Sequence, residues 1–519
     1  ISPHRLGQQQ QSPKFSIDVI KREARKDANE RFSNESLSNV LLCIREASNS
    51  IVDGGSMIFA RFLSCRKHVN AKLDAGSFTK ITKASYAFIQ MTENSNKNNG
   101  KRCVALRSQV HSQARLFLNV KHAAELDKLK TLLEQESWSQ ATVPAHFQEL
   151  LDRLLLPSGD STAVAAALMT SKKSSRDDDD ENKPLPTKIV AKNTNTEHVA
   201  TTTALMLIQI LNEYSDIVES IPDLSADVAR RIAELLGAFN DGTCVLVLGA
   251  QAMQGANLRS ITAKHLSVAQ QSLRLFQSIA PVLKARLSEI TPARSISGDN
   301  LFENNIASSN NSNDDARRKL SFANLDKVGR DFETHCERIH LKLIDIIRDR
   351  LRHHRGNLPQ LAKAWENESI EDFDSSKNNE PSKFASGLIK ELGTLTKVVR
   401  GMFEENDQNN VLGVVALEFD AKLASSLKTV WEERRDFGGT VERHVKTDCD
   451  ALRECLCGLA GKYDSDLIAK ELRELLEIVS ESLEKNKANE AKSIAAAKKD
   501  DLIKTAVDKK DDDDKGDER

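Results

Sequence analysis

The 519-residue chain is poor in aromatic residues, glycine and proline. Phe, Trp and Tyr together make up 5% of the residues, and only 22 glycines and 11 prolines are present. Abundant Leu, Ala, Lys and Glu beside so few Tyr, Trp, Gly and Pro favour helices over sheets. The length is sufficient for two or three helical domains or for one long rod.

Paired cysteines and long apolar runs are also lacking. The eight cysteines are scattered and form no C-x-x-C pair, which is typical of reduced cytosolic thiols packed as small apolar residues. No run of about 18 apolar residues occurs, so we expect no transmembrane helix. Residues 1–14 contain no apolar core and begin without methionine. We therefore expect no secretory signal and interpret the chain as a fragment or a processed product.

The chain has no excess of charge of either sign. Its 74 Lys and Arg residues balance 76 Asp and Glu residues, which gives a formal net charge of −2. Proteins that bind nucleic acid by neutralising phosphates need a basic field, so we predict no nucleic-acid partner. The balance excludes only a global basic field, because a local basic face can be hidden in the average.

Apolar residues recur at helical spacing along most of the chain, and polar breaks divide it into segments. The predicted fold is all-α, with elongated stacked helical bundles and disordered insertions. The predicted segments are a disordered 1–34 with a short helix within 17–31, a bundle 35–156, an acidic and Pro-containing linker 157–195, a bundle 196–290, an Asn/Ser-rich linker 291–318, a C-terminal bundle 319–461, and a charged helix with a disordered tail 462–519.

The first bundle is expected to begin with two short helices. The first covers 35–50, and Gly54-Gly55 is expected to end it. The second covers about 56–73 and is expected to turn four apolar side chains inward, namely Ile58, Phe59, Phe62 and Leu63. A long helix, about 101–137, follows later in this bundle.

Residues 128–155 indicate two helices joined by a defined corner. Pro144 suits the first turn of the second helix, because its ring fixes φ and no backbone N–H is wasted there. Trp138 and Val143 lie at the corner, where an apolar contact between them would fix the angle between the helices. The apolar residues expected on the inner faces are Leu129, Leu132, Leu133, Phe147, Leu150, Leu151, Leu154 and Leu155.

No arrangement of residues predicts a catalytic, cofactor-binding or metal site. Five candidate ligands fall on one predicted helix, but only Cys336 and His340 have the four-residue spacing that shares a face, and zinc needs three or four ligands. We interpret them as a core cysteine beside surface histidines: His335, Cys336, His340, His353 and His354. Cys455 and Cys457 lie two apart on a predicted helix, so their side chains point apart.

Two further stretches suggest chemistry only superficially. Residues 244–255, CVLVLGAQAMQG, look like a strand that leads into a dinucleotide-binding loop, but only Gly249 and Gly255 of the G-x-G-x-x-G pattern are present and no P-loop lysine follows. The basic stretch Arg348–Arg355 is interpreted as an exposed helix end, and contact with acidic lipid or an acidic partner is the alternative. We predict that the chain is not an enzyme and needs no cofactor.

Two blocks of the sequence resemble one known family. Residues 132–152 follow the pattern L-L-x-x-E-x-W-x-x-x-x-V-P-x-x-F-Q-x-L-L-D, and residues 239–254 follow F-N-x-x-x-C-x-L-V-L-G-A-x-A-M-Q. In the same order, these patterns are similar to those of subunit fifty-four of the vacuolar-protein-sorting set, a component of the Golgi-associated retrograde protein (GARP) complex. The resemblance covers about 101–459. It implies that Gly249 and Gly255 are close-packing positions between helices.

The resemblance implies a rod-type subunit of a multisubunit tether. Its expected role is vesicle tethering in retrograde transport from endosomes to the trans-Golgi network, at the cytosolic face of these membranes. Expected partners are the other GARP subunits, SNAREs of the trans-Golgi network and, peripherally, the membrane. The alternatives are a subunit of another rod-type tether such as the exocyst, and an all-α enzyme with an unrecognised site.

Overall fold

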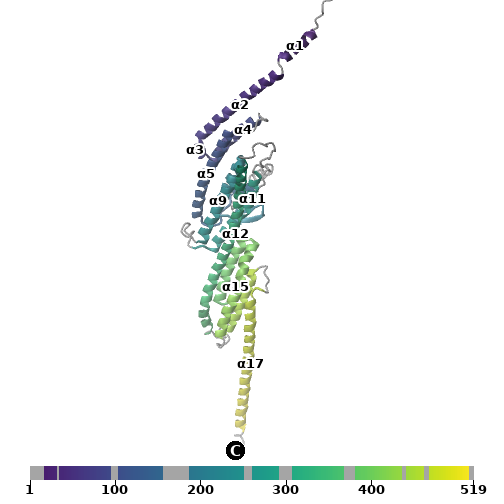
Figure 1. The fold of residues 1–519 in the computed structure, drawn as a ribbon. Coiled ribbons are helices and arrows are strands. Elements are labelled where there is room, and N and C mark those ends of the chain that lie inside the picture. Colours follow the sequence, from purple (N-terminus) through teal and green to yellow (C-terminus); the bar gives the residue numbers. More distant parts are fainter. Residues whose placement is uncertain are drawn as a thin grey trace, which may run out of the picture. The chain divides into compact units, whose positions relative to one another are not determined.

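The computed structural model describes residues 17–31, 34–94, 103–155, 186–249, 260–290, 307–366, 380–434, 440–460 and 467–513. Helices make up nearly all of these residues, and the sheet among them is a single two-stranded hairpin (Figure 1). The predicted all-α class is therefore confirmed. The chain forms two compact units, Ile1–Lys121 and His122–Arg519, and the boundary between them falls within one helix rather than at a predicted linker.

The first unit is entirely helical in its described part. It contains α1 (Ile17–Arg31), α2 (Asn34–Cys65), α3 (Lys67–Asn70), α4 (Ala75–Asn94) and the first part of α5 (Val104–Glu134). The short helix expected within 17–31 is present. The break expected at Gly54-Gly55 is wrong, because α2 continues through both glycines. Packing of the following turns offsets the low helix propensity of the two glycines.

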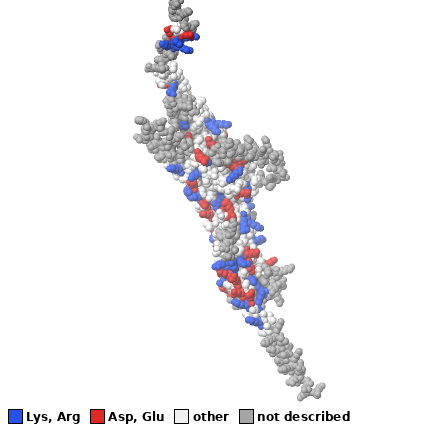
Figure 2. All heavy atoms as spheres, turned by 90° about the vertical axis from the view of Figure 1, so that its right-hand side faces the viewer, with Lys and Arg blue, Asp and Glu red and all other residues white. Residues whose placement is uncertain are grey.

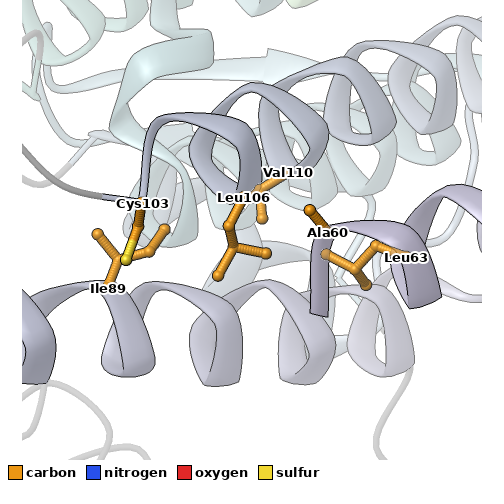
Figure 3. Packing of buried hydrophobic residues seen from close by; sticks show 6 residues of the cluster. All are labelled: Ala60, Leu63, Ile89, Cys103, Leu106 and Val110. Atoms are coloured by element: carbon orange, nitrogen blue, oxygen red, sulfur yellow. The ribbon is translucent and has the colours of Figure 1, made fainter. Parts of the chain in front are cut away.

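The core of the first unit lies on one face of the C-terminal half of α2. Ala60 and Leu63 of α2 pack in one cluster with Ile89 of α4, with Cys103 just before α5, and with Leu106 and Val110 of α5 (Figure 3). Asn70 donates a 3.0 Å hydrogen bond to Gln113 Oε1, and Gln113 in turn donates to the carbonyl of Leu63. The expectation that Ile58 and Phe62 turn inward is wrong, since these side chains are 71% and 58% exposed.

The second unit begins within α5 and contains the remaining elements. They are α6 (Ala145–Leu155), β1 (Lys188–Ala191), β2 (Thr196–Val199), α8 (Thr202–Ser220), η1 (Pro222–Leu224), α9 (Ser225–Thr243), the π-helical η2 (Cys244–Leu248), α11 (Ala263–Ile290), α12 (Ala307–Glu366), α14 (Lys383–Met402), α15 (Glu405–Glu433), α16 (Thr440–Ala460) and α17 (Lys470–Asp513).

Three predicted irregular segments are partly ordered in the structure. The predicted linker 157–195 contains strand β1 and the turn that follows it, and its residues up to 185 lie outside the described part. Helix α12 begins at Ala307, within the predicted linker 291–318, and runs past Pro359 to Glu366. Helix α17 continues to Asp513, where a disordered tail was expected. In each case the segment forms a helix or a paired strand, although its polar composition predicted irregular structure.

Helix α12 joins two groups of helices within the second unit. Its 60 residues correspond to about 90 Å at 1.5 Å per residue. Aromatic rings of α9, α11 and the first half of α12 contact one another in series. The Phe239–Phe276 pair is edge-to-face with centroids 5.0 Å apart, and the Phe276–Phe332 pair is stacked with centroids 6.5 Å apart. Further along, α12 packs against α14, α15 and α16, and the start of α17 lies beside α15 and α16 (Figure 1).

Candidate functional site: the corner and the polar junction

The corner predicted between α5 and α6 is fully buried at its centre. Trp138 is 0% exposed and Val143 is 1% exposed. Two backbone amides of the corner bond to residues that flank the hairpin, since Val143 N lies 2.7 Å from Pro186 O and Ala141 N lies 3.0 Å from Ala200 O. The corner therefore packs against the β1–β2 hairpin, which the sequence reasoning missed.

Glu136 of the corner caps the next helix. Its Oε2 accepts a 2.8 Å hydrogen bond from the backbone N–H of Thr203, in the first turn of α8, although Glu136 is only 5% exposed. Thr201 accepts a second bond from Ala204 N at 3.1 Å. A carboxylate at a helix N-terminus satisfies free N–H groups and is favoured by the helix dipole. The glutamate of the L-L-x-x-E-x-W pattern thus holds α8 against the corner.

Gln148 of α6 pairs with the hairpin as an additional strand residue would. Its Oε1 accepts from Val190 N and its Nε2 donates to Val190 O, both at 2.9 Å. Asp152, one turn later, accepts from Gln148 Nε2 at 2.9 Å and from Lys192 Nζ at 2.6 Å. The F-Q-x-L-L-D pattern therefore fixes the edge of β1, and the first family block is an architectural motif.

A second polar cluster lies where α11, α12 and the first turn of α15 meet; we call Gln270, Arg274, His340 and Asp407 the polar junction. Arg274 donates two hydrogen bonds to the Asp407 carboxylate, from Nε to Oδ2 at 3.2 Å and from Nη2 to Oδ1 at 2.8 Å. Gln270 Nε2 donates to Asp407 at 2.7 Å and lies 3.4 Å from His340 Nε2. The Asp407 and His340 side chains are 6% and 8% exposed. The junction satisfies these buried polar groups with each other.

Burial sets the protonation of the residues at and beside the junction. It lowers the pKa of His340, while the nearby Asp407 carboxylate acts in the opposite direction. It raises the pKa of the fully buried Cys336 thiol to about 12. A thiol of this kind stays protonated near neutral pH, and the thiolate is the form that binds metals and attacks electrophiles. The prediction of a core cysteine is confirmed.

The interpretation of the neighbouring histidines as surface residues is wrong for two of them. His335 is 2% exposed, with Nδ1 3.0 Å from Asn240 Oδ1, and burial lowers its pKa to about 4. His340 belongs to the polar junction, whereas His353 is exposed and His354 lies partly buried 3.5 Å from Glu391. The partners of the two buried histidines come from other helices, so spacing along α12 gave no sign of them.

The described residues contain no group of three or more His, Cys, Asp or Glu side chains placed to hold a metal ion. One buried group has the appearance of a catalytic relay, because His122 lies 3.1 Å from Tyr214 Oη and 2.8 Å from Glu234 Oε2. Tyr214 is 0% exposed, however, and burial raises its pKa. The His122 group therefore joins α5, α8 and α9 and offers no accessible nucleophile.

The apolar run that resembled a nucleotide-binding strand is a π-helical turn at the end of α9. A Cβ on Gly249 would lie 2.4 Å from Val245 O, so the nearest constraint on this glycine comes from the preceding turn of the chain. The close approach between helices occurs instead at Gly242, where a Cβ would lie 2.7 Å from Leu133 Cδ1 of α5. Gly255 lies outside the described residues.

The basic stretch of α12 is partly neutralised by neighbouring carboxylates. Arg348 holds Glu418 of α15 through Nε and Nη2 at 2.7–2.9 Å, and its Nη1 lies 2.9 Å from Asp345. Arg352 pairs with Asp349 at 2.6 Å. On the face shown in Figure 2, basic and acidic side chains are interspersed. Among the helices that the structure describes, none is long and apolar enough to cross a bilayer.

These observations define a predominantly helical protein whose described polar clusters join helices to one another or to the β1–β2 hairpin. Comparison with known proteins specifies the class further. Residues 195–350, which include Gln270, Arg274, His335 and His340, match the model of the Vps54-like protein family.

The curated relatives carry the same family name. Arabidopsis thaliana vacuolar protein sorting-associated protein 54, chloroplastic, is 24% identical over 462 residues, which are 78% of this chain and 42% of that protein. Human vacuolar protein sorting-associated protein 54 is 32% identical over 231 residues, 44% of this chain and 22% of its own length, and the mouse protein is 31% identical over 223 residues, 43% and 21%. The chain is a relative of the Vps54-like proteins, as its two sequence blocks predicted, and it spans less than half the length of these relatives.

Proposed function

We propose that this chain is a non-catalytic helical scaffold in protein sorting. More specifically, we infer a subunit of the GARP tethering complex that acts in retrograde transport from endosomes to the trans-Golgi network. The observation that carries the proposal is the match of residues 195–350 to the Vps54-like family. The names of the curated relatives describe protein sorting and do not describe an enzyme.

The structure of the second unit supports a scaffold role in physical terms. A tether must hold separated contact surfaces at a fixed distance, and packed helices resist bending more than a single helix does. Helix α12 passes from the α9–α11 group to the α14–α16 group, and the polar junction ties α15 to α11 and α12 near the transition. Removal of either charged partner would leave a buried charge, so the junction favours one arrangement of these helices.

The proposal includes partners and a location. The partners are the three other GARP subunits, SNAREs of the trans-Golgi network and the membrane surface, contacted peripherally. The location is the cytosolic face of trans-Golgi and endosomal membranes. The family resemblance supports these assignments, and the matched part is less than half of the length of the relatives.

The test is affinity purification of the tagged full-length protein from its own cells, followed by mass spectrometry. Recovery of the three other GARP subunits above an untagged control would support the proposal. Recovery of exocyst subunits instead would overturn it in favour of another tether, and absence of both with an intact bait would overturn the tether function. Imaging of the tagged protein beside a trans-Golgi marker tests the location, and a uniformly diffuse signal would contradict it.

A further inference from the structure

The first unit carries a local excess of positive charge that the balanced composition of the whole chain hides. Between Asp53 and Glu125 the sequence has twelve Lys and Arg residues but only two acidic residues, Asp74 and Glu93. This stretch is therefore strongly basic, although the formal net charge of the whole chain is −2. A charge asymmetry of this kind within one chain indicates an anionic partner for the basic part.

Several of these cations lie where the chain turns back between α2 and α4, over the short helix α3 (Figure 1). The two longer helices pack against each other on either side of the turn, since the Phe59 and Phe88 rings contact edge to face with centroids 5.9 Å apart. We call the following exposed or half-buried residues at the turn the basic tip: Arg61, Phe62, Arg66, Lys67, Val69 and Lys72.

Buried groups fix the basic tip on α5. Asn70, which is 1% exposed, donates its hydrogen bond to Gln113, and Gln113 donates in turn to the carbonyl of Leu63. The ring of Phe78, in the first turn of α4, stacks on Phe117 of α5 with centroids 4.1 Å apart. The core of the first unit thus uses the residues that alternate with the tip, and the side chains of the tip project from a fixed support.

The cations of the basic tip have no carboxylate partner. Among the described residues no ion pair is made by any of the four, namely Arg61, Arg66, Lys67 and Lys72. Asp74, the acidic residue nearest in sequence, accepts a 2.8 Å hydrogen bond from Ser77 N. In the second unit, by contrast, exposed Lys284 pairs with Asp326 at 2.7 Å. Clustered cations without counter-charges create a positive local field that attracts anions.

Two apolar side chains lie among these cations and indicate which anion the tip fits. Phe62 and Val69 are 58% and 56% exposed. Contacts to nucleic-acid phosphates come from cationic and polar groups, which would leave both side chains in water. A bilayer with anionic lipids accommodates both kinds of residue, because its phosphates attract Lys and Arg while the boundary of the acyl chains accepts an apolar side chain.

The position of the tip also favours a bilayer over an acidic peptide. Proteins that bind a peptide helix enclose its apolar side chains in a groove. The tip lies at a chain reversal, and its apolar side chains point outward between cations. A flat surface can reach all of them at once.

We propose that the basic tip docks on the anionic surface of a membrane, with its cations among the lipid phosphates and Phe62 at the boundary of the acyl chains. The proposal rests on the function proposed above, which supplies the membrane, and it names the surface and the lipid class of the peripheral contact. The contact is weak and reversible, because each basic residue near such a surface raises the partition coefficient about fivefold.

The first test is flotation of the purified full chain with phosphatidylcholine vesicles that contain about 30% phosphatidylserine or none. The unaltered chain should float with the charged vesicles only, and NaCl should weaken this binding by screening. Arg66→Gln combined with Lys72→Gln should lower the partition coefficient at least about tenfold. Both side chains are exposed, so circular dichroism should show an unchanged fold.

The matched control removes the same amount of charge from α12. Lys342→Gln combined with Arg350→Gln replaces two exposed cations of the second unit, and binding should stay within about twofold of the unaltered chain. A control that weakens binding as much as the tip variant would assign the binding to overall charge or to α12. That result, or a chain that does not float with charged vesicles, would overturn the proposal.

Phe62→Trp distinguishes a membrane from other anions. The three natural tryptophans are buried in the second unit, so brominated acyl chains should leave their emission unchanged. Emission from the new tryptophan should be quenched by charged vesicles with brominated chains and by no others. Tight binding to poly-glutamate or RNA, with no quenching by charged vesicles, would assign the tip to an acidic macromolecule and contradict docking on a bilayer.

The outcomes for the tip and for the proposed function can be told apart, because the vesicle assay contains only this chain and lipid. Recovery of the GARP subunits by affinity purification, together with a chain that does not float, would overturn the membrane contact of the tip and leave the tether function standing. Flotation that depends on Arg66 and Lys72, without recovery of any tether subunit, would support the tip and overturn the tether function.

Discussion

Helices α2 and α11 are of similar length but distribute their side chains in opposite ways. Helix α2 exposes large aliphatic residues, and Ile51 and Ile58 are more than two-thirds exposed. Helix α11 buries polar residues, and Gln270, Gln271 and Arg286 are 0%, 2% and 8% exposed. The difference shows that an apolar helix surface indicates only that other apolar groups could pack against it, without specifying which groups they are. A buried polar residue, in contrast, needs particular partners, and the fold supplies them for α11.

The same contrast predicts where substitutions are costly. Polar residues of α11 and its neighbours should matter more for stability than the exposed aliphatic residues of α2. Trp138, Trp365 and Trp431 are the chain's three tryptophans, and all lie buried in the second unit. Their fluorescence therefore reports unfolding of that unit by itself.

The largest effect is expected from Asp407→Ala. It leaves Arg274 without its carboxylate and removes the acceptor of Gln270, so the free energy of unfolding of the second unit should fall by about 3 kcal/mol. Urea unfolding followed by tryptophan fluorescence measures the change. Arg352→Ala is the control, because it breaks an exposed pair and should leave the unfolding midpoint unchanged. Equal midpoints for the two variants would show that the junction adds no stability.

Acid should destabilise the second unit through His335. Burial lowers the pKa of His335 to about 4, whereas the unfolded chain has the ordinary value near 6.5. The unfolded state therefore binds the proton more tightly, and the stability contributed by neutral His335 is lost as the pH falls from about 6.5 to about 4, by roughly 3 kcal/mol in total. His335→Gln keeps a donor for Asn240 and does not titrate, so it should flatten this part of the pH dependence.

Asp448 provides a control of opposite sign for the pH measurement. Burial raises its pKa to about 6, so the folded state binds this proton more tightly and gains stability as the pH falls from about 6 towards 3.8. Asp448→Asn removes that gain and should make the loss below pH 6 steeper. Identical pH profiles for unaltered chain and His335→Gln would contradict the assignment to His335.

A smaller effect is expected at the cap that Glu136 provides for α8. Glu136→Ala removes the acceptor of Thr203 N, and loss of a cap of this kind lowers the free energy of unfolding by about 1–2 kcal/mol. Glu136→Gln retains an acceptor oxygen without the charge and should cost less. The same fluorescence-detected urea titration measures both variants. A glutamine variant as unstable as the alanine variant would show that the negative charge, not the hydrogen bond, stabilises α8.

The smallest effect on fold stability is expected at the exposed aliphatic residues of α2. Ile44→Ser removes a side chain that is 61% exposed, so thermal unfolding of the chain, followed by circular dichroism, should be unchanged. Leu63→Ala on the same helix removes a side chain that is 2% exposed and should lower the midpoint clearly. If Ile44→Ser destabilised the chain as much as Leu63→Ala, Ile44 would belong to the core of the first unit.

Much of the helical architecture follows from apolar periodicity. Leu388 and Leu392, and likewise Leu423 and Leu427, are spaced four residues apart within the predicted C-terminal bundle, and they lie on the buried faces of α14 and α15. The corner was also predictable, since Trp138 and Val143 are both buried as expected. The spacing of apolar residues was sufficient to predict a helix wherever those residues form the buried face of that helix.

Elements that depend on distant partners were missed. The β1–β2 hairpin consists of two four-residue strands, and Gln148 and the corner amides fix it from about forty to sixty residues away. The buried state of His335 and His340 depends on Asn240 and Asp407, which lie on other helices. The continuation of α2 through Gly54-Gly55 depends on packing of its last turns against α4 and α5. No local pattern contains this information.

The pairing of Gln148 with Val190 has a consequence for protein engineering. Together with the bond from Val143 to Pro186, it joins α6 and the corner directly to the hairpin, independently of the chain that connects Leu155 to Pro186. An affinity tag inserted between Leu155 and Pro186 would leave each of these bonds in place, so α6 and the hairpin should keep their register on either side of it.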